Sequence, residues 1–131
     1  MAYENMGRGT ILIADDVEIN RVILGEIIQD MGYHPVLAAD GEEALELVRT
    51  YPPLLILTDI SMPGMSGYEL CRLLKEDEET RNIPVIFISA LDELEDIIEG
   101  FDLGGGDYIT KPFIPEVVKA RVSVQLRLYE M

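Results

Sequence analysis

The chain has 131 residues, and 25 acidic against 10 basic side chains give it a formal net charge of −15 at pH 7. Its length suits one domain, and 48% hydrophobic with 27% charged residues is typical of a folded globular chain. An acidic surface repels phosphate backbones and anionic membranes, so we expect no direct nucleic acid binding and no membrane association. A lone cysteine, with no signal peptide pattern and no membrane-span segment, favours a cytoplasmic location.

Short apolar runs alternate with longer amphipathic segments from residue 10 onward. The runs predict strands over Thr10–Ala14, Pro35–Ala39, Leu54–Thr58, Ile83–Ile88 and the shorter Asp107–Thr110. Apolar residues at helical spacing predict helices over Glu18–Met31, Glu42–Thr50, Tyr68–Glu76, Leu91–Leu103 and Pro115–Tyr129. The alternation predicts an α/β fold: a doubly wound, five-stranded parallel sheet covered by five helices.

Polar side chains follow four of the predicted strands. Asp15 and Asp16 follow the first strand, and Asp59, Ser89 and Lys111 follow the third, fourth and fifth. Ligands of doubly wound sheets bind at the carboxyl ends of the strands, so we expect these side chains to form one site. Asp16, Asp59 or Ser89 taken alone would be better explained as a helix N-cap, and only the three carboxylates together with Lys111 favour a site.

This set of side chains suits phosphoryl transfer. Three adjacent carboxylates repel one another unless a cation lies among them, and oxygen ligands of this kind suit Mg²⁺. Asp59 is then placed to act as a nucleophile toward phosphorus, because a metal offsets the charge of the incoming group. Lys111 supplies a second cation for the phosphoryl oxygens, and Ser89 supplies a hydroxyl donor.

Four segments together resemble the receiver domain of two-component response regulators, over essentially residues 10–129. They are Ile13-Ala14-Asp15-Asp16, Leu57 to Gly67, Ile88-Ser89-Ala90 and Asp107 to Phe113. The resemblance implies a flavodoxin-like sheet with strand order 2-1-3-4-5, which makes the first and third strands neighbours. The chain is then a single receiver domain over residues 1–131, or a fragment of a longer regulator that ends before an output domain.

The resemblance also implies a role for each site residue. Asp59 is the expected phosphoacceptor, and the expected Mg²⁺ ligands are Asp15, Asp16, Asp59 and the carbonyl of Ser61. Lys111 is expected to contact the phosphoryl group and to precede a cis bond to Pro112. Ser89 and Tyr108 are the expected switch pair. The triple glycine Gly104–Gly106 departs from the family pattern, and we expect it to loosen the segment before the last strand.

The implied function is a phosphorylation-controlled switch in a two-component phosphorelay. A histidine kinase or histidine phosphotransfer protein is the expected donor, and the fourth helix, fifth strand and fifth helix are the expected surface for an output domain, a partner or a second copy. Such a domain catalyses its own aspartyl phosphorylation and slow autodephosphorylation without being a classical enzyme. Two alternatives stay open: a Mg²⁺-dependent phosphohydrolase with an aspartyl nucleophile, and a receiver that binds a partner without phosphorylation.

Overall fold

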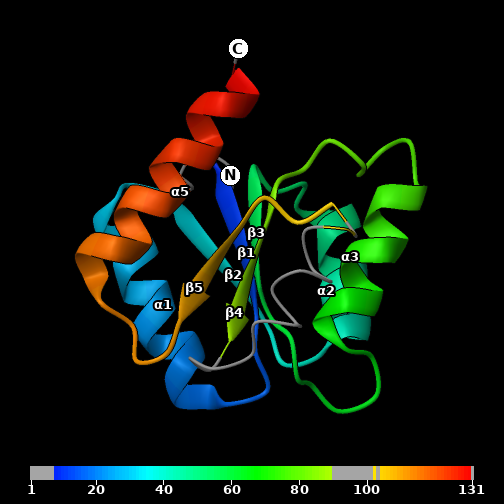
Figure 1. The fold of residues 1–131 in the computed structure, drawn as a ribbon, viewed down its shortest axis with the longest axis horizontal. Helices are drawn as coiled ribbons and strands as arrows, with labels where there is room; N and C mark the ends of the chain where they lie inside the picture. The colour runs from blue at the N-terminus through cyan, green and yellow to red at the C-terminus, as the bar shows by residue number, and fades with distance from the viewer. Residues whose placement is uncertain (1–7, 90–101, 103, 131) are drawn as a thin grey trace.

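The computed structural model describes residues 8–89, 102 and 104–130 (Figure 1). Its five strands are β1 (Thr10–Ala14), β2 (His34–Ala38), β3 (Leu55–Asp59), β4 (Val85–Ser89) and β5 (Asp107–Thr110). They form one parallel sheet in the order β2-β1-β3-β4-β5. The predicted fold class and strand order are therefore confirmed.

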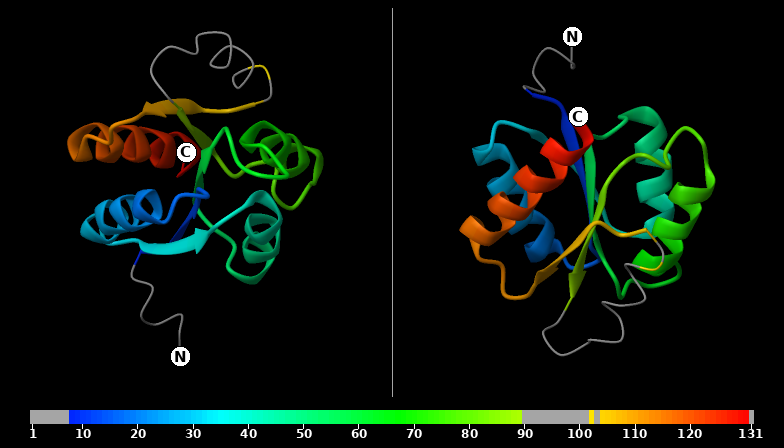
Figure 2. Two further views of the ribbon diagram at one scale, coloured as in Figure 1. Left: turned by 90° about the horizontal axis from the view of Figure 1, so that it is seen from below. Right: turned by 45° about the horizontal axis from the view of Figure 1, so that its top comes forward.

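Helices cover both faces of the sheet (Figure 2). The helices within the described residues are α1 (Glu18–Asp30), α2 (Gly41–Thr50), α3 (Gly67–Glu76) and α5 (Pro115–Glu130). Figure 2 shows α1 and α5 on one face and α2 and α3 on the other. The helix predicted over Leu91–Leu103 lies almost wholly outside the described residues. None of the described helices is both long and apolar enough to cross a membrane.

The sheet is buried from both sides by two apolar layers. Every residue of β1, β3 and β4 is buried, because side chains that alternate along each strand meet helices on either face. Leu12, Ile56 and Phe87 belong to the layer beneath α2 and α3. Ile13 and Leu57 belong to the opposite layer, beneath α1 and α5. This double burial holds the ends of the central strands in fixed positions.

Two strand boundaries differ from the prediction in a way that matters for the site. Asp59 and Ser89 are the last residues of β3 and β4 rather than the first residues after them. The reason is pairing, since Asp59 is in register with Ile88 and Ser89 with Thr110. The backbone of both site residues is therefore part of the sheet.

The start of α3 lies unusually close to the end of β3. The Gly67 N–H donates to the Ile60 carbonyl at 2.8 Å. A Cβ added to Gly67 would lie 2.2 Å from the backbone oxygen of Asp59, a distance that real Cβ atoms do not adopt. Only glycine allows this contact, which fixes the turn that follows the strand.

We therefore expect Gly67→Ala to lower the free energy of unfolding by roughly 1–3 kcal/mol, as overpacking does in protein cores. Gly25→Ala in α1 is the matched control, because a Cβ there meets only ordinary contacts at 3.8 Å. The control should be neutral or more stable by up to about 1 kcal/mol, since alanine favours helix more than glycine does. Urea unfolding of both variants measures the difference. If Gly67→Ala and Gly25→Ala had the same free energy of unfolding, position 67 would accommodate a Cβ and the proposed clash with the Asp59 carbonyl would be wrong.

Candidate functional site

Three carboxylates meet at the carboxyl edge of the sheet, as predicted. Asp15 and Asp16 follow β1, and Asp59 ends the neighbouring strand β3. One carboxylate oxygen from each lies within 4.8 Å of those of the other two. Asp15 is 0% and Asp59 5% exposed, whereas Asp16 is open to solvent. The arrangement is one that a divalent cation would stabilise.

The explanation of Asp16 and Asp59 as helix N-caps does not hold. The N-cap position of α1 is Val17, without a side-chain cap, and the hydroxyl of Ser66 caps α3. The Asp40 side chain caps α2 by accepting from the Glu43 N–H at 2.8 Å. The acidic cluster therefore has no capping role that would account for it.

Asp15 has a buried carboxylate oxygen that lacks a hydrogen-bond partner. Its Oδ1 accepts a hydrogen bond from the Val17 N–H at 2.9 Å. Its Oδ2 is buried without a hydrogen-bond partner. Burial raises the pKa of the Asp15 carboxyl, and the charge of Asp59 raises it further, against the opposing effects of the Val17 N–H, Lys111 and Asn20. A bound cation would give Asp15 Oδ2 the partner that it lacks, so this oxygen is suited to be a metal ligand.

Lys111 contacts Asp59 directly. Its Nζ lies 3.0 Å from Asp59 Oδ2, and its backbone N–H donates to the Ser89 carbonyl at 3.0 Å. Burial alone would lower the Lys111 pKa, but the hydrogen bond to Asp59 and the surrounding carboxylates outweigh it and raise the pKa. Lys111 therefore stays cationic at neutral pH. The bond to Pro112 is cis, as the resemblance predicts.

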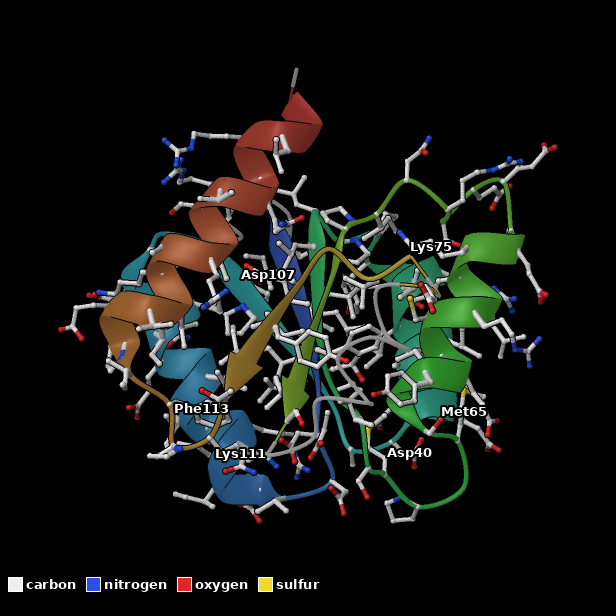
Figure 3. All side chains as sticks on the ribbon, viewed as in Figure 1. Asp40, Met65, Lys75, Asp107, Lys111 and Phe113 are labelled. Carbon is white, nitrogen blue, oxygen red and sulfur yellow. The ribbon has the colours of Figure 1, made fainter. Side chains whose placement is uncertain are left out.

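The other oxygen of Asp59 faces the following loop. Asp59 Oδ1 accepts from the Ser61 N–H at 3.2 Å. Figure 3 shows Lys111 at the lower edge of the sheet, with Asp40 at that same edge on the α2 side. The loop from Ser61 to Ser66 thus begins at the carboxylate that is expected to react. Metal binding by the Ser61 carbonyl stays a prediction.

The two expected switch residues are both buried. Ser89 is 3% and Tyr108 7% exposed. The Tyr108 ring packs against Phe87 at a centroid distance of 5.5 Å, and its hydroxyl lies 3.3 Å from the hydroxyl of Tyr68. Tyr68 also packs edge-on against Phe87 at 5.3 Å. A chain of three rings thus joins α3 to β4 and β5.

Three residues that contribute to this region are not indicated by the sequence pattern. The helical pattern places Tyr68 at the start of a helix but does not indicate its contacts with the Phe87 ring and the Tyr108 hydroxyl on the same face of the sheet. Arg21 on α1 donates to the Asp15 carbonyl at 2.8 Å, which ties the helix to the metal-site backbone. Gly67 allows the close approach to β3. None of these contacts has a signal in the sequence, because each depends on segments that only folding brings together.

Comparisons with known proteins agree on the family. The pattern that defines the response regulator receiver domain matches residues 11–123. The transcriptional regulatory protein PhoP for alkaline phosphatase synthesis in Bacillus subtilis is 39% identical over 121 residues, covering 92% of this chain and 50% of PhoP. The response regulator PleD of Caulobacter vibrioides is 42% identical over 112 residues, covering 86% of this chain and 25% of PleD.

A solved structure of a chemotaxis protein has the same fold as this chain. The chemotaxis protein CheY4 of Vibrio cholerae superposes with a TM-score of 0.84 at 28% identity, covering 88% of this chain and 97% of CheY4. The chain belongs to the response regulator receiver domains of two-component systems. It spans half the length of PhoP and a quarter of PleD, so those relatives contain regions without a counterpart here.

We predict that Asp15→Asn stabilises the metal-free protein at neutral pH. The raised pKa means that ionised Asp15 destabilises the fold, so the native protein loses stability as the pH rises through that pKa. Asparagine removes the charge and keeps an oxygen for the Val17 N–H. The gain should be on the order of 1 kcal/mol, measured by thermal unfolding in a metal chelator.

The gain should disappear in acid, where Asp15 is protonated in both the folded and the unfolded chain. Asp16→Asn is the matched control, and its effect should be smaller because Asp16 is exposed. Addition of Mg²⁺ should reverse the order, stabilising the parent more than Asp15→Asn. A lower stability of Asp15→Asn without metal would show that the buried carboxylate is not under electrostatic stress.

Proposed function

We propose that this receiver domain accepts a phosphoryl group on Asp59 in a Mg²⁺-dependent reaction and thereby switches the surface that meets an output domain or partner. The observation that carries the proposal is the surroundings of Asp59. Its carboxylate ends a central strand, has the Lys111 ammonium at 3.0 Å, and lies within 4.8 Å of two further carboxylates. A nucleophile, a cation and a metal-ligand set thus meet in one place.

The residues fit the metal that the family implies. Asp15, Asp16, Asp59 and the carbonyl of Ser61 would hold Mg²⁺, and the support on the protein side is the orphaned Oδ2 of Asp15. Bound there, the cation would offset the charge of the carboxylates and of the incoming phosphoryl group. The three carboxylates alone would repel a phosphodonor, which is why we expect an absolute metal requirement.

In the proposed reaction an Asp59 oxygen attacks phosphorus. The new acyl phosphate bond forms as the bond between phosphorus and the donor breaks, and the leaving group stays with the donor, a histidine kinase or a histidine phosphotransfer protein. Lys111 then transfers its hydrogen bond from Asp59 to a phosphoryl oxygen, and the Ser89 hydroxyl donates to another. Hydrolysis of the acyl phosphate by water completes the slow autodephosphorylation, so the domain catalyses its own cycle.

Exposed apolar side chains next to the site support contact with a protein donor. Val17, Ile19 and Val22 are 43%, 59% and 42% exposed, and they lie on or just before the first turns of α1, directly after Asp16. Apolar exposure of this kind is typical of interaction surfaces. We propose the cytoplasm as the compartment, because histidine phosphodonors are expected there and a chain with one cysteine forms no internal disulfide.

Asp59→Asn tests the phosphoacceptor. With Mg²⁺ and acetyl phosphate, intact mass measurement of the parent should show one added phosphoryl group that is lost in base. Asp59→Asn should show none. Asp40→Asn is the matched control at the same edge, because asparagine also caps helices well and Asp40 is outside the carboxylate cluster.

A persistent adduct on Asp59→Asn would place the phosphoacceptor elsewhere. Rapid turnover of a generic phosphate ester would instead favour the phosphohydrolase alternative. Absence of any adduct on the parent, with bound Mg²⁺, would favour a receiver that acts without phosphorylation.

We further propose that Ser89 and Tyr108 transmit the phosphorylation. A ligand shifts a two-state equilibrium only by its preference for one state, and a change from mostly inactive to mostly active needs roughly 3–5 kcal/mol. One hydrogen bond from Ser89 to a charged group contributes about 1.5–3 kcal/mol, so Lys111 must supply the rest. Tyr108 is held by Tyr68 and Phe87, so its movement would also alter contacts on α3.

Ser89→Ala should leave Asp59 able to accept phosphate but weaken the response of β5. Amide chemical shifts of residues 104–110, with and without the phosphoryl mimic beryllofluoride, measure that response. Thr50→Ala is the control, since it removes a hydroxyl that bonds only within α2. Identical shifts in Ser89→Ala and the parent would show that the coupling runs through Lys111 rather than the hydroxyl.

A further inference from the structure

A cavity at the amino edge of the sheet lies at the opposite end of the strands from the acidic cluster. Its volume is about 260 Å³, and it is lined by Arg8, Met31, Tyr33, Ser123, Leu126 and Arg127. The first of these precedes β1, the next two flank the turn from α1 to β2, and the other three lie on α5. Figure 1 shows the start of β1 and the C-terminal part of α5 at this edge, whereas Lys111 lies at the other edge in Figure 3.

The charge in this cavity is unusual for so acidic a chain. Only 10 residues are basic, against 25 acidic ones, yet two of the ten line this one space. Within the part of the chain that the structure describes, neither Arg8 nor Arg127 forms an ion pair with a carboxylate. Asp30, at the end of α1, is already paired with Lys119. The two guanidinium groups therefore create a positive region with no counter-ion from the described residues.

One of the two arginines is held in place. The Arg8 guanidinium donates to the Met31 carbonyl at 3.3 Å, and its central carbon lies 4.7 Å from the centre of the Tyr33 ring. This cation–π contact leaves other N–H groups of the fork available, because one hydrogen bond uses only one of them. A preoriented guanidinium loses less entropy when it binds an anion.

Apart from Ser123, the remaining walls are largely apolar. Tyr33 and Leu126 are 8% and 6% exposed, and Met31 is half-buried. An engineered cavity of about 150 Å³ accommodates benzene, so a single ring with an acidic substituent is of a suitable size for this space. A dinucleotide is too large, since drug-sized ligands occupy about 300–1,000 Å³.

We propose that this cavity binds a small organic anion that combines an apolar body with one carboxylate or phosphate group. The oxyanion contacts Arg8 and Arg127, with the Ser123 hydroxyl as a third donor, and the apolar body lies against Tyr33 and Leu126. A ligand in this position bridges the start of the sheet, the end of α1 and α5, and thereby stabilises the fold through binding to the native state. The site is separate from Asp59 and does not rest on its phosphorylation.

Phenyl phosphate and benzoate are the probes, since they share a ring and differ in the anion. Titration of the whole chain in chelator, without Mg²⁺, should shift the amide signals of residues 8–10, 31–34 and 123–127. Benzyl alcohol, a neutral ring of similar size, should bind at least ten-fold more weakly. The anion that binds more tightly identifies phosphate or carboxylate as the preferred group. Inorganic phosphate measures the affinity of the anion without the ring.

Arg127→Gln should weaken binding of the preferred probe at least ten-fold, and Arg8→Gln should do the same. Arg49→Gln is the matched control, because Arg49 is also exposed and has no carboxylate ion pair among the described residues, but lies on α2. It should leave the affinity unchanged. Failure of both anions to bind, equal binding of benzyl alcohol, an unchanged affinity in Arg127→Gln, or shifts centred on Asp15, Asp59 and Lys111 would each overturn the proposal.

Discussion

The site depends on one electrostatic constraint: three carboxylates held within 4.8 Å of one another at the edge of a sheet that is buried on both faces. The buried strands β1 and β3 leave Asp15 and Asp59 little freedom to move apart. Lys111 offsets part of the charge through Asp59 Oδ2, but the Oδ2 of Asp15 has no partner. In the metal-free protein the carboxylates therefore repel one another at this edge. The burial of apolar side chains in the two layers offsets the free-energy cost of that repulsion.

This repulsion links the fold to the proposed chemistry. A group that brings positive charge to the cluster relieves the repulsion, and a group that adds negative charge to Asp59 changes the balance that holds Lys111 in place. The Lys111 N–H also donates to the Ser89 carbonyl, so in the proposed switch a change at the carboxylates would reach the ends of β4 and β5 through this one residue. The contacts of Lys111 with both Asp59 and Ser89 are the physical basis of the proposed switch.

Much of this organisation could be predicted from the sequence. Apolar runs and helical spacing predicted all five strands and the four described helices, because burial on both faces leaves a strong pattern. The strand order came from the family resemblance, and the meeting of Asp15, Asp59 and Lys111 followed from it. The Tyr68–Tyr108 hydroxyl pair and the cavity between Arg8 and Arg127 could not be predicted, since each joins segments far apart in the sequence. The contact of Gly67 with β3 is local, but it depends on the path of the loop between them, which the residue pattern does not define. At Gly106, the last residue of the triple glycine, packing also favours glycine: a Cβ there would lie 2.4 Å from Oε1 of the buried Gln125.

An experimental structure of this chain with Mg²⁺ and beryllofluoride tests most directly whether the carboxylate cluster holds a metal and Asp59 accepts the phosphoryl group. We expect beryllium bonded to the Asp59 carboxylate, Mg²⁺ bound by Asp15 Oδ2 and the Ser61 carbonyl, and Lys111 Nζ moved from Asp59 to a fluoride. A beryllofluoride group bound elsewhere, or an Asp15 Oδ2 still without a partner in the complex, would contradict this expectation.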